Sequence, residues 1–214
     1  MSLLATTCIS GCPEREPGMN MADFDTTAFA LEYLADLQRT LSELDLNAVE
    51  AFASAVEEVM DGGGTVHFIG NGGSAGTPSH SAGDWSKELT LPTLCHVDNI
   101  SGLTAWANDS DYENIFVGAL QTFLRPGDIV VGYSGSGNSA NVINGLVYAK
   151  EQGCTTIGVG GDYMGGGGGK MAKLVDIPIV AKTHSMERIE DLQLVINHIV
   201  KESIKARRGI SSQC

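Results

Sequence analysis

Four side chains that could hold a metal ion or move a proton lie in two separate stretches of the chain. His80 and Asp84 are four residues apart in "SHSAGDWSKEL", whereas Glu190 and His198 lie in "MERIEDLQLVINHIVKES". Residues four apart on a helix project from one face, so His80 and Asp84 could share a metal ion or a proton. Such pairs are also common on protein surfaces. The four side chains therefore form one site only if the two predicted helices meet in the fold.

Two loops rich in glycine and serine are candidates for binding a phosphate group. The loop "GNGGS" follows the apolar run "TVHFI", and "SGSGNS", residues 134–139, follows "DIVVGY". Glycines let backbone N–H groups approach an anion closely, and the N-terminus of a following helix favours negative charge. Ser134, Ser136 and Ser139 add hydroxyl groups. We therefore favour a phosphate cradle without a lysine over a simple turn in which Ser139 caps a helix.

The first loop also fits a dinucleotide site. Gly70, Gly72 and Ala75 match the pattern G-x-G-x-x-G/A, and Asp98 ends the next apolar run, where a ribose-binding carboxylate would stand. A simple dinucleotide site does not explain the serine loop, however. A dinucleotide-binding oxidoreductase is therefore the lesser alternative.

A third loop, "GGDYMGGGGGK" at residues 160–170, says little about function. Five consecutive glycines favour a mobile surface loop. A Walker-type phosphate loop does not fit, because Met164 replaces its first glycine and Met171 replaces the Ser or Thr that would meet magnesium.

The elements that would position these residues follow from hydrophobic periodicity. Helical spacing over residues 26–40 and 46–60 predicts an N-terminal pair of helices. Five short apolar runs then alternate with helical patterns: "TVHFIG", "TLCHVD", "DIVVGYS", "TTIGVGG" and "VDIPIVA". This alternation predicts an α/β fold, a three-layer sandwich with a five-stranded parallel sheet. Ligands of such sheets bind beyond the carboxyl ends of the strands, where both candidate loops lie.

Composition limits the possible partners. The chain has 214 residues with 13 Lys and Arg against 26 Asp and Glu, a net charge of -13, so it lacks the basic field that nucleic-acid binding requires. No apolar run is long enough to cross a membrane. Five scattered cysteines form no disulfide framework, which favours a cytoplasmic location. We expect one domain over 23–208, with a loose extension at 1–22 and a tail at 209–214.

Together the motifs resemble the SIS (sugar isomerase) domain family, and within it the sedoheptulose 7-phosphate isomerases, also called phosphoheptose isomerases. The resemblance covers about residues 45–205 and rests on "GNGGS", "ANDSDYENIF", "GYSGSGNSANVINGLVYAKEQGC", "GGKMAKLVDI" and "RIEDLQLVINH". It implies a flavodoxin-like five-stranded parallel sheet, with the N-terminal helical pair used to assemble a homotetramer. It also implies active sites at subunit interfaces.

The resemblance further implies a reaction and the residues that perform it. The reaction converts D-sedoheptulose 7-phosphate to D-glycero-D-manno-heptose 7-phosphate through an enediol(ate), with one Zn²⁺ per active site. Asp84 would be the base and His198 the acid. The implied metal ligands are His80, Asp84, Glu190 and His198. The implied substrate-binding residues are Asn71, Gly72, Gly73, Ser74, Asp84, Asn108, Asp109, Ser134, Gly135, Ser136, Ser139 and Glu190.

Three positions depart from the pattern of that family. Asp84 stands where the isomerases usually have Glu, and its shorter side chain would place a base roughly an ångström away, a displacement that can be costly to rate. Glu190 replaces a neutral Gln, and Glu88 replaces a residue that is commonly basic, for which Lys87 is the nearest substitute. The Asp84 change gives weight to an alternative function. The chain would then be a non-catalytic SIS module that binds a sugar phosphate or a protein partner.

Overall fold

The computed structural model describes residues 24–211, so the extension expected at 1–22 lies outside the described residues. The chain divides into two compact units, one ending at Asp36 and the other beginning at Leu37. The boundary lies within the first helix, α1 (Thr26–Ser42). In the described part of the chain, no helix is both long and apolar enough to cross a membrane. The candidate site residues all belong to the second unit.

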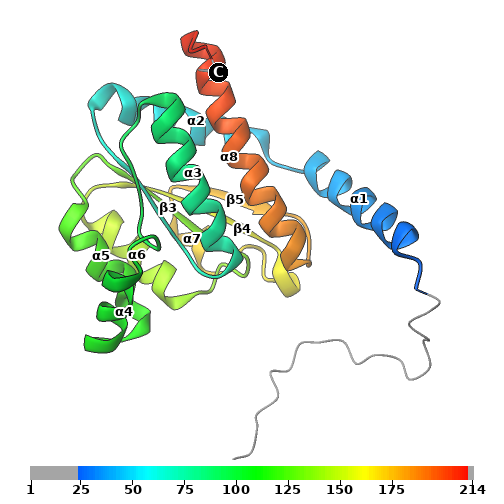
Figure 1. The fold of residues 1–214 in the computed structure, drawn as a ribbon, viewed down its shortest axis with the longest axis horizontal. Helices are drawn as coiled ribbons and strands as arrows, with labels where there is room; N and C mark the ends of the chain where they lie inside the picture. Colours follow the sequence, from blue (N-terminus) through cyan, green and yellow to red (C-terminus); the bar gives the residue numbers. More distant parts are fainter. Residues whose placement is uncertain (1–23, 212–214) are drawn as a thin grey trace, which may run out of the picture. The chain divides into compact units, whose positions relative to one another are not determined.

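The centre of the second unit is a five-stranded parallel sheet (Figure 1), which confirms the predicted fold class. Its strands are β1 (Val66–Gly70), β2 (Thr93–Cys95), β3 (Ile129–Ser134), β4 (Thr155–Gly161) and β5 (Ile177–Ala181). The strand order is β2-β1-β3-β4-β5. Every residue of β1 and β3 is buried, as expected for parallel strands that are covered on both faces.

Helices cover both faces of this sheet (Figure 1). One apolar core lies beneath α2 (Leu46–Gly62), α3 (Gly73–Leu89) and α8 (Met186–Arg208). The other lies beneath α5 (Ile115–Phe123), α6 (Ala140–Glu151) and α7 (Met171–Leu174). The remaining elements are α4 (Ile100–Asp109), which packs on α5, and two 3-10 turns, η2 (Tyr112–Asn114) and η3 (Tyr163–Gly165).

The helix α2 shows how local sequence sets these boundaries. Its N-cap residue, Asp45, accepts hydrogen bonds from the backbone N–H groups of Asn47 and Ala48. Its C-cap residue, Gly63, adopts φ of 70°, a left-handed conformation that glycine reaches without a steric penalty. The "DGGG" segment therefore stops the helix where the sequence predicts. Both expected N-terminal helices are present.

The switch point of the sheet lies between β1 and β3. The chain runs from β1 outward to β2 and then returns to place β3 on the other side of β1. Gly70 pairs in register with Tyr133, so the carboxyl ends of the two strands lie side by side. The glycine loop and the serine loop therefore leave the sheet next to one another, which is where ligands bind in open α/β sheets.

A buried pair of histidines links three of these strands. Nδ1 of His67 in β1 lies 3.0 Å from Nε2 of His96, which follows β2, and Nε2 of His67 lies 3.2 Å from Oδ2 of Asp128, which precedes β3. The two imidazole rings stack at an angle of 8°. Burial lowers the pKa of His96 to about 3, with a further contribution from His67. Burial also lowers the pKa of His67, although Asp128 opposes that shift.

Acid should therefore weaken the fold through these histidines. The unfolded chain binds a proton at His96 with a pKa near 6.5, whereas the folded chain does so only near 3, so stability falls as the pH drops through this window. Between pH 7 and pH 5 the loss from His96 is roughly 2 kcal/mol. Urea unfolding at the two pH values measures it. The variant His96→Gln should lose about that much pH dependence, whereas His184→Gln, at an exposed position, should keep it; equal pH dependence in both variants would contradict the assignment.

Candidate functional site

The glycine loop, the serine loop and the start of α8 line a cleft of about 250 Å³ at the switch point. We call it the serine-loop cleft. Most of the predicted substrate-binding residues lie in it. They are Asn71, Gly72, Gly73, Ser74, Ser134, Gly135, Ser136, Ser139 and Glu190. Tyr133 and Met186 complete its lining.

The serine loop has the form of an anion site. Ser139 is the N-cap residue of α6, but its side chain makes no capping hydrogen bond. Its Oγ instead lies 3.0 Å from Oγ of Ser134, so both hydroxyls face the same loop. The simple-turn alternative, in which the Ser139 side chain caps the helix, is therefore not what the structure shows. The N-terminus of α6 remains available for an anion.

Asn71 is fixed in the cleft by two residues that sequence reasoning missed. The side-chain amides of Asn71 and Asn141 exchange hydrogen bonds of 2.8 and 2.9 Å. The hydroxyl of Tyr112 also donates to Oδ1 of Asn71, at 3.0 Å. Both partners belong to motifs that had been singled out, "SGSGNSANV" and "ANDSDYENIF", but only the fold shows that these motifs meet at Asn71.

Glu190 reaches the serine-loop cleft because Gly73 has no side chain. A Cβ at Gly73 would overlap the Glu190 carboxyl group. Burial raises the pKa of Glu190, and the charges of Glu187 and Asp191 raise it further. Glu190 is thus an acidic group held against the glycine loop, in a position to contact a bound substrate.

Asn108 and Asp109 do not line the serine-loop cleft. They lie at the C-terminal end of α4, both exposed, with Nδ2 of Asn108 donating to Oδ1 of Asp109 at 2.8 Å. The 3-10 turn that follows them carries Tyr112, which contacts Asn71. Their expected contact with substrate remains a prediction.

The dinucleotide alternative finds less support. A Cβ at Gly70 would overlap the carbonyl oxygen of Ser74, so Gly70 is needed for the close approach of α3 to the end of β1. Asp98, the expected ribose ligand, lines a different cleft. The glycine pattern therefore has a packing explanation that needs no dinucleotide.

The long glycine run is part of this region. The backbone N–H of Met171 donates to the carbonyl of Gly137 at 2.9 Å, and the N–H of Lys170 donates to Oδ1 of Asn138 at 3.2 Å. Within the run, Gly167, Gly168 and Gly169 all adopt positive φ. These contacts tie the run to the serine loop, in contrast to the free surface loop that its composition favours.

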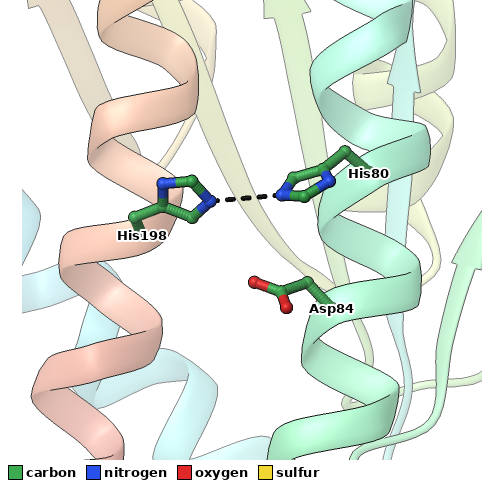
Figure 2. Close-up of side chains that lie close together, drawn as sticks. All are labelled: His80, Asp84 and His198. Carbon is green, nitrogen blue, oxygen red and sulfur yellow. Dashed lines mark hydrogen bonds between the residues drawn. The ribbon is translucent and has the colours of Figure 1, made fainter.

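The two predicted helices do meet, and they bring three of the four expected metal ligands together. Figure 2 shows His80 and Asp84 on α3 facing His198 on α8. Nε2 of His80 lies 3.2 Å from Nε2 of His198, and one ligand atom from each of the three residues lies within 4.8 Å of the others. Glu190 is not in this cluster. It lies eight residues before His198 on α8, which corresponds to roughly 12 Å along a helix axis.

The donor set fits a divalent metal ion. Two imidazole nitrogens and a carboxylate oxygen are ligands that zinc accepts, and bond lengths of about 2.0–2.1 Å in tetrahedral geometry separate two nitrogens by roughly 3.4 Å. The distance between the histidine nitrogens is close to this value. Oδ2 of Asp84 accepts a hydrogen bond from Lys201, while Oδ1 has no hydrogen-bond partner among residues 24–211. The cluster can therefore share a cation.

A buried chain of hydrogen bonds holds the two helices in place. The hydroxyl of Tyr133 in β3 donates to Oδ1 of Asn197 at 2.7 Å, and Nδ2 of Asn197 donates to Oγ of Ser81 at 2.6 Å. All three side chains are at most 1% exposed. Ser81 and Asn197 are the chain neighbours of His80 and His198. The hydrogen bonds therefore set the position of both histidines relative to the sheet.

The positive charge beside Asp84 comes from α8. Nζ of Lys201 lies 2.6 Å from Oδ2 of Asp84 and 3.2 Å from Oε1 of Glu88, and Lys205 pairs with Glu88 as well. Lys87, the substitute that sequence suggests, is exposed. Hydrogen bonds from Lys205 and Lys201 lower the pKa of Glu88 to about 2. Burial disfavours the charge of Lys201, but its acidic partners outweigh burial and raise its pKa to about 12.

Removing this charge should destabilise the contact between α3 and α8. The side chain of Lys201 is 8% exposed, so Lys201→Met would leave the Asp84 carboxylate without its cation and Glu88 with Lys205 alone. We expect a loss of roughly 2–3 kcal/mol in the free energy of unfolding, measured with urea. Lys150→Met is the matched control, because the ion pair of Lys150 with Asp176 is exposed on both sides. The control should lose less than about 1 kcal/mol, and equal losses would show that Lys201 has no special role.

Comparison with known proteins agrees with this geometry. A probable phosphoheptose isomerase of Thermoplasma volcanium is 36% identical over 174 residues, which cover 79% of this chain and 87% of the relative. The phosphoheptose isomerase of Rhodospirillum rubrum is 37% identical over 158 residues, covering 72% of this chain and 82% of the relative. The solved phosphoheptose isomerase of Neisseria gonorrhoeae superposes with a TM-score of 0.78 at 26% identity, covering 84% of this chain and 98% of that one.

The family model for the SIS domain matches residues 31–161, a segment that contains β1 to β4 and both loops of the serine-loop cleft. The match, the identities and the fold agree with one another. The chain therefore belongs to the SIS domain family and, within it, to the phosphoheptose isomerases.

Proposed function

We propose that this protein is an aldose–ketose isomerase that interconverts D-sedoheptulose 7-phosphate and D-glycero-D-manno-heptose 7-phosphate. The observation that carries the proposal is that the two helices carrying the proton-transfer cluster, α3 and α8, begin at the cleft that holds the anion cradle. Gly73 and Glu190 line the serine-loop cleft, and His80 and His198 lie about two turns further along the same helices. A phosphorylated sugar needs both parts, one for its phosphate and one for its reacting carbons.

The serine loop would hold the phosphate. The hydroxyls of Ser134, Ser136 and Ser139 and the N-terminus of α6 supply hydrogen-bond donors and a positive dipole end. A lysine is not required, because backbone and hydroxyl groups can satisfy the phosphate oxygens locally. Asn71, held by Asn141 and Tyr112, would orient the sugar chain with little loss of side-chain freedom on binding.

Asp84 and His198 would move the protons. Aldose–ketose exchange needs a base to take a proton from one carbon and an acid to protonate the neighbouring oxygen. The Asp84 carboxyl group accepts a hydrogen bond from Lys201 and has one oxygen without a hydrogen bond from residues 24–211. His198, at hydrogen-bond distance from His80, would serve as the acid. Lys201 also holds the Asp84 carboxylate in one orientation. This orientation matters because the Asp side chain is short and a base must be placed accurately for proton transfer.

A divalent metal ion, which we propose to be zinc, would be held by His80, Asp84 and His198. When bound, such an ion stabilises negative charge on the sugar oxygens. The resemblance to the family also implies Glu190 as a ligand. The Glu190 carboxyl group lies beside Gly73, away from the cluster of His80, Asp84 and His198. We therefore propose that Glu190 contacts the substrate.

Turnover should depend on the cluster, and substrate affinity should depend on the serine loop. We expect His198→Ala and Asp84→Ala each to lower kcat by about 10²–10⁴-fold, because each removes a proton-transfer group. Ser136→Ala should raise KM by roughly five- to tenfold with a smaller effect on kcat. A proton NMR time course with sedoheptulose 7-phosphate measures both, and His184→Ala is the matched control at an exposed histidine.

Isotope exchange tests the mechanism separately. In D₂O, deuterium should enter the carbon next to the carbonyl during turnover, since the base exchanges its proton with solvent. Turnover without such label would count heavily against the proposed route. Wild-type protein that binds the sugar phosphate but never turns it over would instead identify the alternative, a non-catalytic SIS module.

Zinc titration tests the metal site independently of activity. By calorimetry, His80→Ala and His198→Ala should each bind zinc about 100-fold more weakly or not at all, because each removes one ligand. Glu190→Gln should stay within about threefold of wild type if three ligands hold the ion. A loss in Glu190→Gln as large as that in the histidine variants would make Glu190 the fourth ligand.

We further propose that the protein is a cytoplasmic homotetramer with active sites completed at subunit interfaces. This assembly is what the resemblance to the phosphoheptose isomerases implies. Light scattering coupled to size-exclusion chromatography should give the mass of four chains, each of 22.5 kDa. A monomer that turns over substrate would contradict the interfacial site.

A further inference from the structure

A second cleft, of about 840 Å³, lies along the β2 edge of the sheet. We call it the β2-edge cleft. It is formed by one side of α3, by β2 and the loop after it, and by α4 and α5. As far as the described residues go, it shares no lining residue with the serine-loop cleft. The proposed isomerase reaction therefore makes no use of it.

The chain of side chains from Asp128 to His96 ends in this cleft. The Asp128 carboxylate accepts backbone N–H groups from Thr65 and Arg125 and is an acceptor only, so Nε2 of His67 must donate to it. Nδ1 of His67 is then unprotonated and must accept its hydrogen bond from Nε2 of His96. The remaining nitrogen of His96, Nδ1, is therefore the unprotonated one and carries a free lone pair.

That lone pair is available to the β2-edge cleft. His96 lines the cleft although the residue is only 7% exposed. In the part of the chain that the structure describes, no hydrogen bond reaches Nδ1, yet this atom is not among the fully buried polar atoms that lack a partner. The geometry thus presents a nearly buried acceptor, locked in one tautomer, to the space of the cleft.

The other lining groups define the chemistry of a ligand. Asp98 adds a carboxylate, a second acceptor. Trp106 and Phe123 line the cleft with apolar rings that are 39% and 50% exposed. Among the described residues that line it there is no lysine or arginine, so an anion such as a phosphate finds no counter-charge there. Acceptors beside partly exposed aromatic rings suit a ring with hydroxyl donors and apolar C–H faces.

We propose that the β2-edge cleft binds an uncharged polyhydroxylated ring, a sugar without phosphate. One ring hydroxyl donates to Nδ1 of His96 and another to Asp98, while an apolar face of the ring lies on Trp106. The serine-loop cleft would thus bind the phosphate of a ligand, whereas the β2-edge cleft would bind uncharged hydroxyl groups.

The test uses methyl glycosides of glucose, mannose and galactose, which carry no phosphate and cannot open to the chain form that an isomerase needs. Long-range ¹H–¹⁵N NMR of the histidines should show His96 protonated at Nε2 and unprotonated at Nδ1. At least one glycoside should shift the His96 Nδ1 signal and the Trp106 indole signal in a saturable way. Trp85, which is fully buried, is the internal control and should not move.

Variants separate binding from folding. His96→Leu and Trp106→Ala should each weaken glycoside binding by roughly five- to tenfold, because one removes the acceptor and the other the ring face. Trp106→Ala leaves the hydrogen bonds among Asp128, His67 and His96 intact. Weaker glycoside binding in this variant therefore does not result from a disturbed histidine pair. Ser136→Ala, in the serine loop, should bind the glycoside as the wild type does.

Three results would overturn the proposal. A proton on Nδ1 of His96 would mean that the acceptor does not exist. Saturable shifts that disappear in Ser136→Ala would place the sugar in the serine-loop cleft. The absence of saturation with all three glycosides at millimolar concentration would show that the cleft does not take this class of ligand.

Discussion

The contact between α3 and α8 is the constraint on which the rest of the site depends. Tyr133, Asn197 and Ser81 form a hydrogen-bond chain from the central strand β3 through α8 to α3, with each side chain almost fully buried. Buried polar groups are costly when unpaired, so the chain favours one relative position of the two helices. In that position His80 and His198, the neighbours of Ser81 and Asn197, face each other (Figure 2).

Further along the contact between α3 and α8, the positive charge lies on a different helix from the one that the family resemblance implies. The family resemblance places a basic residue on α3 at position 88, where this chain has Glu88. Here the positive charge comes from Lys201 and Lys205 on α8, and both acidic partners, Asp84 and Glu88, lie on α3. The ion pairs therefore cross the helix contact. The position of the proposed base, Asp84, therefore depends on how the two helices pack.

The topology of the sheet explains why phosphate binding and helix packing occur side by side. The parallel strands β1 and β3 are neighbours, and the chain continues from β1 to β2 on one side and from β3 to β4 on the other. The loops that follow β1 and β3 therefore lie at the same edge of the sheet, and α3 begins directly at the end of the glycine loop. Two glycines allow α3 to begin there. A side chain at Gly70 would overlap Ser74, and a side chain at Gly73 would overlap Glu190. The same edge thus holds an anion cradle and starts the helix that carries His80 and Asp84.

The sequence alone determined the sheet and the chemistry of its loops. Apolar runs and helical periodicity are local signals, and they predicted all five strands, the N-terminal helices and the two loops beyond the carboxyl ends of β1 and β3. The spacing of His80 and Asp84 placed both on one face of α3, but only the family resemblance joined them to His198. Contacts between residues of different elements depend on strand order, loop conformation and helix packing, which no local pattern contains. The tertiary structure therefore decided that Lys201 supplies the charge for Asp84, that the Ser139 side chain faces Ser134 instead of forming a capping hydrogen bond, that Glu190 lies beside Gly73, and that His67 and His96 form a buried pair.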